Sequence, residues 1–313
     1  LICEKKKIVN FENIKSFIKK NDVLIINDTK VKPTVINGKL NGKSIKITLL
    51  ENVNDYFWKS FIKPGRKAKI GDVIKLNNNF NLVVKEKKNA FVYLKVNKGI
   101  EAVNSYLKKY GSLPLPPYIK TSFSRKENEK NYQTVFAKKI GAVASPTAGL
   151  HFNEKLIESL KKSHISIINI TLHIGEGTFL PLKENKVKLN KLHKEKGFIS
   201  KKSALEINNA INKGKKIVAV GTTVMRLLEA CYNKYGEIRY FNEETDLFIY
   251  PGFKFNIVDK LLTNFHLPKS SLFILVSAFA GKNYMMKLYE FAIKKKLRFF
   301  SYGDAMLVKR NDF

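Results

Sequence analysis

The hydrophobic pattern changes character along the first hundred residues. Val23 to Asn27 is a short apolar run closed by Asp28, which is typical of a buried strand. From Pro33 to about Asn97 the pattern becomes short alternating segments separated by turn residues such as Asn41-Gly42 and Gly71-Asp72. Many short strands without a helix between them predict a small antiparallel β-barrel or sandwich.

The second half alternates strands with helices. After a helix near Ile100–Tyr110, we predict helices from Asn153 to about Lys162 and at Ser203–Lys213, Thr223–Tyr235, Ser270–Ala280 and Asn283–Lys296, with strands at Ile165–Leu172, Lys216–Val220, Asp246–Tyr250 and Arg298–Tyr302. This alternation implies a mostly parallel sheet covered on both faces. The predicted fold is therefore α/β, with a mostly parallel mixed sheet formed by residues 1–32 and 100–313 and a small antiparallel β-barrel domain inserted at residues 33–99.

Length and cysteine content narrow the class of protein. The longest apolar stretch, Ser271 to Ala280, has about half the length needed to cross a bilayer, and the first residues lack the apolar core of a signal peptide. Cys3 and Cys231 form neither a disulfide framework nor a metal site. We therefore expect a soluble cytoplasmic protein with no membrane association and no metal. A monomer is a separate expectation. The chain begins with Leu1 rather than Met, so we also expect a further N-terminal segment.

The charge is strongly positive, with 58 basic and 26 acidic residues and a formal net charge of +32. Such an excess favours a polyanionic partner, nucleic acid above all. Only six of the basic residues are arginine, and Asn and Ile are abundant, a composition that an AT-rich genome gives to any protein surface. Both explanations stay open, so the charge supports a nucleic-acid partner without proving one.

Small residues are concentrated between Gly141 and Phe152, just before a predicted helix. Small side chains let a ligand approach backbone N–H groups, and a helix N-terminus adds a partial positive charge. Pro146, Thr147 and Gly149 are therefore candidate ligand-binding residues, with His151 beside them. The alternative is that they only shape the connection and that the histidine packs under it.

A second predicted strand runs into a Gly-x-Gly turn made by Gly175 and Gly177, with His173 at the strand end. This is a weak nucleotide signal, because no third glycine follows at the spacing of a dinucleotide-binding motif. His173 can equally be a structural histidine.

A third strand ends in Gly221-Thr-Thr223, followed by Arg226. Ligands in open α/β sheets collect at the carboxyl ends of strands. The glycine and the two threonines could donate to ribose or carboxylate oxygens, and Arg226 could bind a carboxylate or phosphate. The alternative is that Thr222 only caps the following helix.

A fourth stretch, Leu261 to Ser271, is apolar but contains Asn264, His266 and Lys269. Near the C-terminus, Tyr302 and Asp304 are predicted to leave the last strand. Three of the five histidines thus lie at element ends with glycine, proline or polar neighbours, which favours a site.

Several enzyme classes are excluded by missing motifs. The histidines lack metal-ligand spacing, and no cysteine pair accompanies them. No Gly-x-x-x-x-Gly-Lys-Ser/Thr loop and no Gly-x-Ser-x-Gly turn is present, which excludes P-loop NTPases and the common serine hydrolases.

Taken together, these stretches resemble one family over nearly the whole chain. The matching blocks, in order, are Val23-Leu-Ile-Ile-Asn-Asp-Thr-Lys-Val31, Pro64-Gly-Arg-Lys67 with Gly71-Asp72, Leu113-Pro-Leu-Pro-Pro-Tyr-Ile119, Tyr132-Gln-Thr-Val-Phe-Ala137, Pro146-Thr-Ala-Gly-Leu-His-Phe152, His173-Ile-Gly-Glu-Gly-Thr-Phe179, Gly221-Thr-Thr223 with Arg226, Phe248-Ile-Tyr-Pro-Gly252, Leu261-Leu-Thr-Asn-Phe-His-Leu-Pro-Lys-Ser270 and Ser301-Tyr-Gly-Asp-Ala-Met306. The sequence is similar to the S-adenosylmethionine:tRNA ribosyltransferase-isomerases of the queuosine pathway.

The resemblance implies one reaction and one pair of substrates. The ribosyl part of S-adenosylmethionine, a co-substrate, moves to the aminomethyl group of a 7-deazaguanine base at the tRNA wobble position and is isomerised to an epoxycyclopentanediol, while adenine and methionine leave. It also implies an α/β domain with a β-barrel. Two departures matter: Val224 stands where the family usually has Ser, and only His193 and Glu195 match the family's His-Met-His-Ser-Glu stretch. The family begins some two dozen residues earlier.

The residue roles follow as expectations from the resemblance and the demands of the reaction. A base must remove a proton beside the sulfonium and an acid must assist adenine, and histidine suits both. We expect His151 and His173 to line the reacting ribose. The carboxylates expected to orient a histidine are Asp28, Glu195 and Asp304. The residues expected to hold S-adenosylmethionine are Pro146, Thr147, Gly149, Gly175, Gly177, Gly221, Thr222, Thr223 and Arg226. The residues expected to contact tRNA are Lys63, Arg66, His266 and Lys269.

Two other functions stay open. A non-catalytic RNA-binding protein would use the same basic surface, but it would leave the histidine-bearing turns unexplained, because phosphate binding needs only Lys and Arg. A nucleotide-dependent oxidoreductase is disfavoured by the missing dinucleotide-binding motif.

Overall fold

The computed structural model describes residues 1–3, 7–77, 79–116, 118–119, 123–179, 192–268 and 270–311. The chain divides into two compact units, one made of Leu1–Lys30 and Asn131–Phe313 and the other of Val31–Lys130. The smaller unit is therefore an insertion near the start of the larger one.

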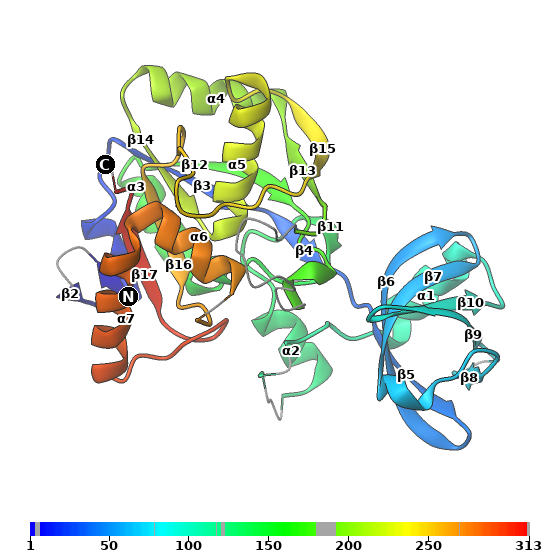
Figure 1. Ribbon diagram of the computed structural model, residues 1–313. Coiled ribbons are helices and arrows are strands. Elements are labelled where there is room, and N and C mark those ends of the chain that lie inside the picture. The colour runs from blue at the N-terminus through cyan, green and yellow to red at the C-terminus, as the bar shows by residue number, and fades with distance from the viewer. Residues whose placement is uncertain are drawn as a thin grey trace. The chain divides into compact units, whose positions relative to one another are not determined.

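The larger unit is built on a sheet with nine strands among the described residues (Figure 1). In spatial order they are β15 (Phe241–Thr245), β13 (Glu195–Ile199), β12 (Ser166–Leu172), β3 (Asp22–Asn27), β14 (Lys216–Val220), β16 (Lys260–Asn264), β17 (Ala305–Lys309), β1 (Ile2–Cys3) and β2 (Lys7–Ile8). Strands β12, β3, β14 and β16 are parallel, whereas β13 and β17 flank them in the antiparallel direction. The carboxyl ends of the four parallel strands and the amino ends of β13 and β17 thus share one edge, the carboxyl edge. The opposite edge is the amino edge.

Alternation along the central strands gives the sheet two apolar faces. All of β3 is buried, with Val23 and Ile25 in one core and Leu24 and Ile26 in the other, as expected of a central parallel strand. One face packs against α4 (Lys201–Asn212), α5 (Thr222–Tyr235), α6 (Ser271–Ala280) and α7 (Lys282–Lys294), and the other against α3 (Glu154–Lys162) and the 3₁₀ helices η2 (Phe11–Ser16) and η4 (Thr147–His151) (Figure 1). The predicted α/β class, with helices on both faces of a mixed sheet, is confirmed.

The smaller unit contains a closed antiparallel barrel, which confirms the predicted insertion. Its strands are β5 (Val35–Leu40), β6 (Lys43–Asn54), β7 (Phe57–Lys63), β8 (Val73–Lys75), β9 (Asn81–Lys88) and β10 (Phe91–Val96), and the 3₁₀ helix η3 (Gly65–Lys67) follows β7. The helix α1 (Ile100–Tyr110) buries Val103, Tyr106 and Leu107 in the barrel core. For this reason the smaller unit extends beyond the expected boundary at residue 99, and it also includes most of α2 (Arg125–Asn131).

Short elements connect the two units. The strand β4 (Thr29–Val31), where the chain leaves the larger unit, pairs with β11 (Lys139–Ala142) in a separate two-stranded sheet. The backbone oxygen of Asp28 accepts the N–H groups of Lys138 and Lys139 at 2.8 and 3.1 Å. The outgoing and returning chains are therefore fixed to each other at the carboxyl edge.

Two of the predicted strands are wrong. The strand near Asp246–Tyr250 lies instead at Phe241–Thr245, a polar edge strand whose charged residues hide its strand character. The last strand is Ala305–Lys309 rather than Arg298–Tyr302. Asp304 accepts the backbone N–H of Arg298 at 2.8 Å, and its own N–H donates to the Arg298 carbonyl at 2.7 Å, which makes the earlier segment a turn. Tyr302 and Asp304 therefore precede a strand.

None of the helices in the described parts of the chain is long and apolar enough to span a membrane. Among the same residues, no group of three or more His, Cys, Asp or Glu side chains is arranged to hold a metal ion. Cys231 is a free thiol inside α5, and burial raises its pKa.

Candidate active site

Polar residues gather at the carboxyl edge of the sheet. The parallel strands deliver Asn27 to Thr29 after β3, His173 after β12, Gly221 to Thr223 after β14, and Asn264 at the end of β16, while Glu195 opens β13 and Asp304 precedes β17. From β3 the chain leads on to β12 on one side, and from β14 it leads to β16 on the other. Ligands of open α/β sheets bind at such switch points, outside the carboxyl ends of the strands.

His151 is held by an amide at the end of β16. Asn264 donates from Nδ2 to His151 Nε2 at 3.0 Å, and the Thr147 hydroxyl donates to Asn264 Oδ1 at 3.0 Å. The Phe11 ring stacks on the imidazole, with 5.0 Å between ring centroids and 23° between planes. Burial lowers the pKa of His151 to about 4, so the ring is neutral at pH 7. Its unprotonated nitrogen is Nε2, because that atom accepts the amide.

His173 contacts a hydroxyl at the start of β4, two residues after β3 ends. The Thr29 Oγ1 and His173 Nδ1 atoms are 2.7 Å apart. Asn27 fixes the surrounding backbone, since its Oδ1 accepts the N–H groups of Thr29 and Leu172, both at 3.1 Å. A Cβ on Gly141 would lie 2.3 Å from the imidazole, so only glycine fits beneath this ring.

Glu195 and Arg226 form a buried ion pair under the Gly-x-Gly turn. Arg226 Nη1 donates to Glu195 Oε2, and Gly175 donates its N–H to Oε1 at 3.0 Å. Arg226 Nε donates to the Leu247 carbonyl at 3.1 Å. In the described structure, however, the buried Arg226 Nη2 has no hydrogen-bond partner. An unsatisfied buried donor costs about 1–3 kcal/mol, so an anionic ligand that reached Nη2 would bind with a gain of that order.

The turn after β14 begins a helix that lacks a side-chain cap. Gly221 adopts a φ of +97°, and its N–H donates to the Leu262 carbonyl at 2.8 Å. Thr222 lies inside α5 rather than capping it, so the simple capping explanation is wrong. Thr223 Oγ1 is 3.4 Å from Asn27 Nδ2, and a Cβ on Gly221 would lie 3.5 Å from Ala148 in η4. The turn therefore packs between the two histidine-bearing segments.

The three carboxylates expected to orient a histidine have other partners. Asp28 Oδ1 accepts the Thr171 hydroxyl at 2.6 Å, and Glu195 pairs with Arg226. Asp304 binds the Arg298 backbone and guanidinium; burial opposes ionisation, but these bonds hold the pKa of Asp304 below its usual value. A hydroxyl contacts His173 and an amide contacts His151. Burial lowers the pKa of His151, and the charge of Asp304 acts against this larger effect.

The remaining predicted residues are dispersed. His266 Nε2 lies 2.9 Å from the Thr263 hydroxyl, and burial lowers the pKa of His266 to about 4. A Cβ on Gly177 would lie 2.8 Å from the His193 ring, and Gly149 packs against Thr134. Pro146 precedes η4, Lys63 and Arg66 are exposed in the smaller unit, and Lys269 lies outside the described residues.

Asn27, Thr29 and Phe11 were missed by sequence reasoning. A signal for the first two was available, because Asn27-Asp28-Thr29 places three polar residues directly after a fully apolar strand core. No comparable signal marks Phe11, which comes from a 3₁₀ helix more than a hundred residues before the histidine that it stacks on.

The fold and site define an α/β protein with a barrel insertion and paired histidine-bearing turns at the carboxyl edge of its sheet. The model of the family described as queuosine biosynthesis protein matches residues 2–308. The S-adenosylmethionine:tRNA ribosyltransferase-isomerase of Thermoanaerobacter sp. (strain X514) is 42% identical over 308 residues, covering 95% of this chain and 87% of that protein. The protein of the same name from Sulfurihydrogenibium sp. (strain YO3AOP1) is 43% identical over 300 residues, with the same coverage. A crystal structure of S-adenosylmethionine tRNA ribosyltransferase from Thermotoga maritima is 31% identical, covers 95% of this chain and 85% of that chain, and has a TM-score of 0.49. This chain belongs to the queuosine biosynthesis protein family.

Proposed function

We propose that this chain is an S-adenosylmethionine:tRNA ribosyltransferase-isomerase. It moves the ribosyl group of S-adenosylmethionine to the aminomethyl group of a 7-deazaguanine at the tRNA wobble position and isomerises it to the epoxycyclopentanediol of epoxyqueuosine, releasing adenine and methionine. The observation that carries this proposal is the similarity over 95% of the chain to proteins of that name. The convergence of the family's sequence blocks on the carboxyl edge supports it.

His151 is the candidate base. The reaction requires a base for a carbon-bound proton beside the sulfonium, and a base must be unprotonated before it acts. Burial keeps His151 neutral, and its Nε2 is the nitrogen without a proton. Catalytic hydrogen bonds often rearrange when substrate binds, so the substrate would replace the Asn264 amide at Nε2. His173, fixed through Nδ1 by Thr29, is then the candidate acid for adenine departure.

Arg226 is the candidate anchor for the S-adenosylmethionine carboxylate. Its Nη1 and Nε have protein partners, whereas the buried Nη2 has none among the described residues, so a carboxylate oxygen there would complete the guanidinium. The turn Gly221–Thr223, the start of η4 and the Gly175–Gly177 turn would surround the rest of the molecule. Lys63, Arg66, His266 and Lys269 stay proposed contacts for tRNA. We also propose a cytoplasmic monomer that needs no metal.

Adenine release tests the proposed reaction directly. With S-adenosylmethionine and tRNA carrying the deazaguanine precursor, free adenine should appear in a one-to-one ratio with modified tRNA. Either substrate alone should give none, because the ribosyl group needs its acceptor. Tight tRNA binding without adenine release would instead support the non-catalytic RNA-binding function. Full activity in the presence of a chelator is expected if no metal takes part.

A further inference from the structure

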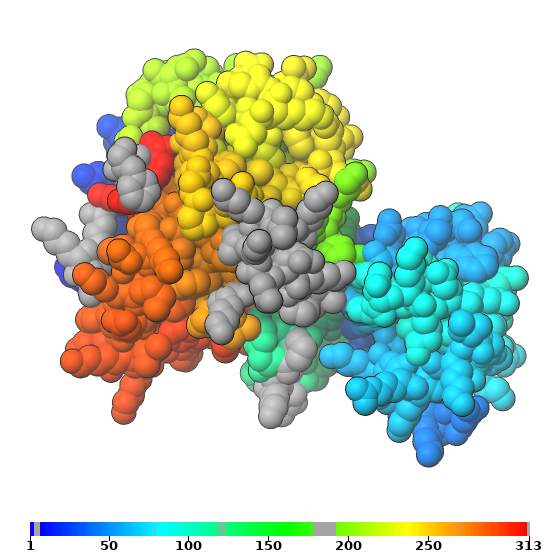
Figure 2. Space-filling view, viewed as in Figure 1, coloured from blue at the N-terminus to red at the C-terminus, as the bar shows by residue number. Residues whose placement is uncertain are grey.

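One loop of the barrel has several basic side chains that are exposed to solvent. The basic loop, defined as Pro64–Asp72, follows Lys63 at the end of β7 and presents Arg66, Lys67 and Lys69 as exposed side chains. Ala68 alone in this stretch is fully buried, and it anchors the loop in the barrel core. Figure 2 shows the smaller unit in blue and cyan, with long side chains projecting from its surface.

Hydrogen bonds fix the backbone of the basic loop. Lys87 on β9 reaches under it and donates from Nζ to the Gly65 carbonyl at 3.1 Å and to the Ala68 carbonyl at 2.9 Å. Asp72 Oδ2 accepts the Lys69 N–H at 2.7 Å, which closes the other end of the loop. The backbone of Asp72 accepts the Val84 N–H at 2.9 Å. These contacts order the backbone before any ligand binds, which reduces the entropy lost on binding.

The arrangement of charge does not favour folding of the barrel. Lys46 lies directly opposite Lys63 across β6 and β7, and Lys39 lies directly opposite Lys75 across β5 and β8. Like charges directly opposite each other on neighbouring strands are destabilising. The carboxylate of Asp72 already receives a backbone N–H, and Lys87 adds another positive charge beneath the loop. A polyanion bound outside the barrel would relieve this repulsion and gain binding energy from it.

We infer that the basic loop is a preformed site for the phosphates of an RNA backbone and that Lys87 is the residue that positions it. This inference rests on the proposed function in one respect, because it takes the RNA to be tRNA. Arg66 suits a bidentate phosphate contact, while Lys67 and Lys69 supply point charges on either side of the buried Ala68. Lys87 acts through the two carbonyls that it binds rather than by touching RNA.

Salt dependence separates a direct contact from a positioning role. Labelled tRNA is titrated with protein over a range of KCl concentrations, and the slope of log affinity against log salt is measured. Each phosphate contact contributes about 0.7–0.9 to this slope, so Arg66→Ala, Lys67→Ala and Lys69→Ala should each reduce it by roughly that amount. Lys87→Met should reduce it by more than one contact, because the whole loop loses its geometry. Lys88→Met, at the neighbouring exposed lysine of β9, is the matched control and should leave it almost unchanged.

Two further readouts protect the test from a general loss of folding. The KM for S-adenosylmethionine and the melting temperature of Lys87→Met should stay near the parent values, and Lys87→Arg should restore the slope. In an Arg66→Ala background, Lys87→Met should cost less affinity than in the parent, since part of what it positions is already gone.

Specific outcomes would overturn the inference. A slope for Lys87→Met no different from that of Lys88→Met would remove the positioning role. An Arg66→Ala/Lys67→Ala/Lys69→Ala protein that binds tRNA with the parent slope would show that the loop is not the site. Because binding is measured without turnover, absence of adenine release with the expected slopes would refute the proposed reaction and leave this inference intact.

Discussion

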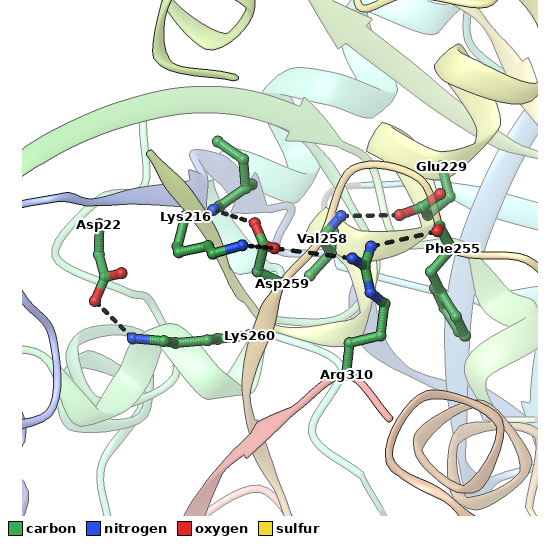
Figure 3. Close-up of polar contacts among 9 residues, drawn as sticks. Asp22, Lys216, Glu229, Phe255, Val258, Asp259, Lys260 and Arg310 are labelled. Atoms are coloured by element: carbon green, nitrogen blue, oxygen red, sulfur yellow. Dashed lines mark hydrogen bonds and ion pairs between the residues drawn. The ribbon is translucent and has the colours of Figure 1, made fainter. Parts of the chain in front are cut away.

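Polar side chains at the two edges of the nine-stranded sheet have different kinds of partner. At the amino edge the charges satisfy one another: Lys260 binds Asp22 at 2.7 Å, and Asp259 binds Lys216 at 3.0 Å and reaches Arg310 at 4.0 Å (Figure 3). At the carboxyl edge the imidazoles of His151 and His173 contact an amide and a hydroxyl, and Arg226 pairs with Glu195 through Nη1 while its Nη2 has no partner among the described residues.

The paired charges of the amino edge serve to stabilise the fold, whereas the polar groups of the carboxyl edge can still bind a ligand. Glu229 on α5 likewise has its partners within the protein, since its carboxylate accepts the N–H groups of Asn256, Ile257 and Val258 and so fixes the loop before β16. Figure 3 shows the contact with Val258. Burial raises the pKa of Glu229, and the three donors oppose this only in part. A network of this kind leaves no capacity for a ligand. The neutral imidazole of His151 and the Arg226 Nη2, which has no partner among the described residues, leave that capacity.

The largest expected effect is on turnover at the carboxyl edge. His151→Ala should lower kcat of the folded protein by roughly 10²–10⁴ while tRNA affinity stays near the parent value, because a base is lost. The loss of the Phe11 stacking should lower the melting temperature as well. His164→Asn is the control, since His164 is an exposed histidine with a φ of +58° that Asn tolerates. Near-parent turnover in folded His151→Ala protein would eliminate His151 as the base, and the same variant of His173 would be tested next.

The amino edge should show the reverse. Lys260→Met leaves the Asp22 carboxylate buried without its partner, so the free energy of unfolding should fall by about 3–5 kcal/mol while kcat of the folded protein is unchanged. Lys216→Met, at an exposed pair, should cost at most about 1 kcal/mol. Denaturant titration and active-site-normalised rates measure both. A fall in kcat of folded Lys260→Met protein would mean that the amino edge takes part in the chemistry.

Arg226 should give an effect of intermediate size. Arg226→Lys retains a cation for Glu195 but has no atom that replaces Nη2, so the KM for S-adenosylmethionine should rise roughly tenfold to a hundredfold, as expected for a lost bond worth 1–3 kcal/mol. The KM for tRNA should not change. If Arg226→Lys only lowers stability and leaves both KM values as they were, the guanidinium is structural.

The last expected effect, on pH dependence, comes from two buried histidines. Burial lowers the pKa of both His151 and His266 to about 4 from 6.5, so the native protein takes up fewer protons than the unfolded chain between these values. Stability should therefore fall as the pH drops from 6.5 towards 4, and the acidic limb of kcat/KM should lie near pH 4. Denaturant midpoints at pH 7 and pH 5 measure the first effect, and His266→Gln should reduce it. Equal midpoints would contradict it.

The sequence predicted the parts of the fold that depend on local pattern. The apolar runs of β3 and of Lys216–Val220 predict buried strands, and the short alternating segments predict the barrel. The edge strand Phe241–Thr245 was not predicted, because an edge strand with two glutamates has almost no hydrophobic pattern. The extent of the smaller unit also escaped, because only packing shows that Tyr106 belongs to the barrel core.

The sequence predicted that the candidate residues lie together at one edge of the sheet, but it did not predict their hydrogen-bond partners. The histidines and the Gly221–Thr223 turn were found because residues after parallel strands must meet at one edge. Their partners depend on side-chain geometry across segments more than a hundred residues apart, such as Thr147 and Asn264. General chemistry favours a carboxylate beside a catalytic histidine, and this led to the assignment of Asp28, whose partner is Thr171.

The Thr29 hydroxyl that contacts His173 lies close in sequence to the start of the smaller unit. Thr29 is separated only by Lys30 from Val31, where the inserted unit starts. The pairing of β4 with β11 fixes this part of the backbone at the carboxyl edge of the sheet. A displacement of a few tenths of an ångström at Thr29 changes the length of a 2.7 Å hydrogen bond enough to weaken it and re-aim the imidazole. The position of Thr29 and the orientation of the His173 ring are therefore linked through this hydrogen bond.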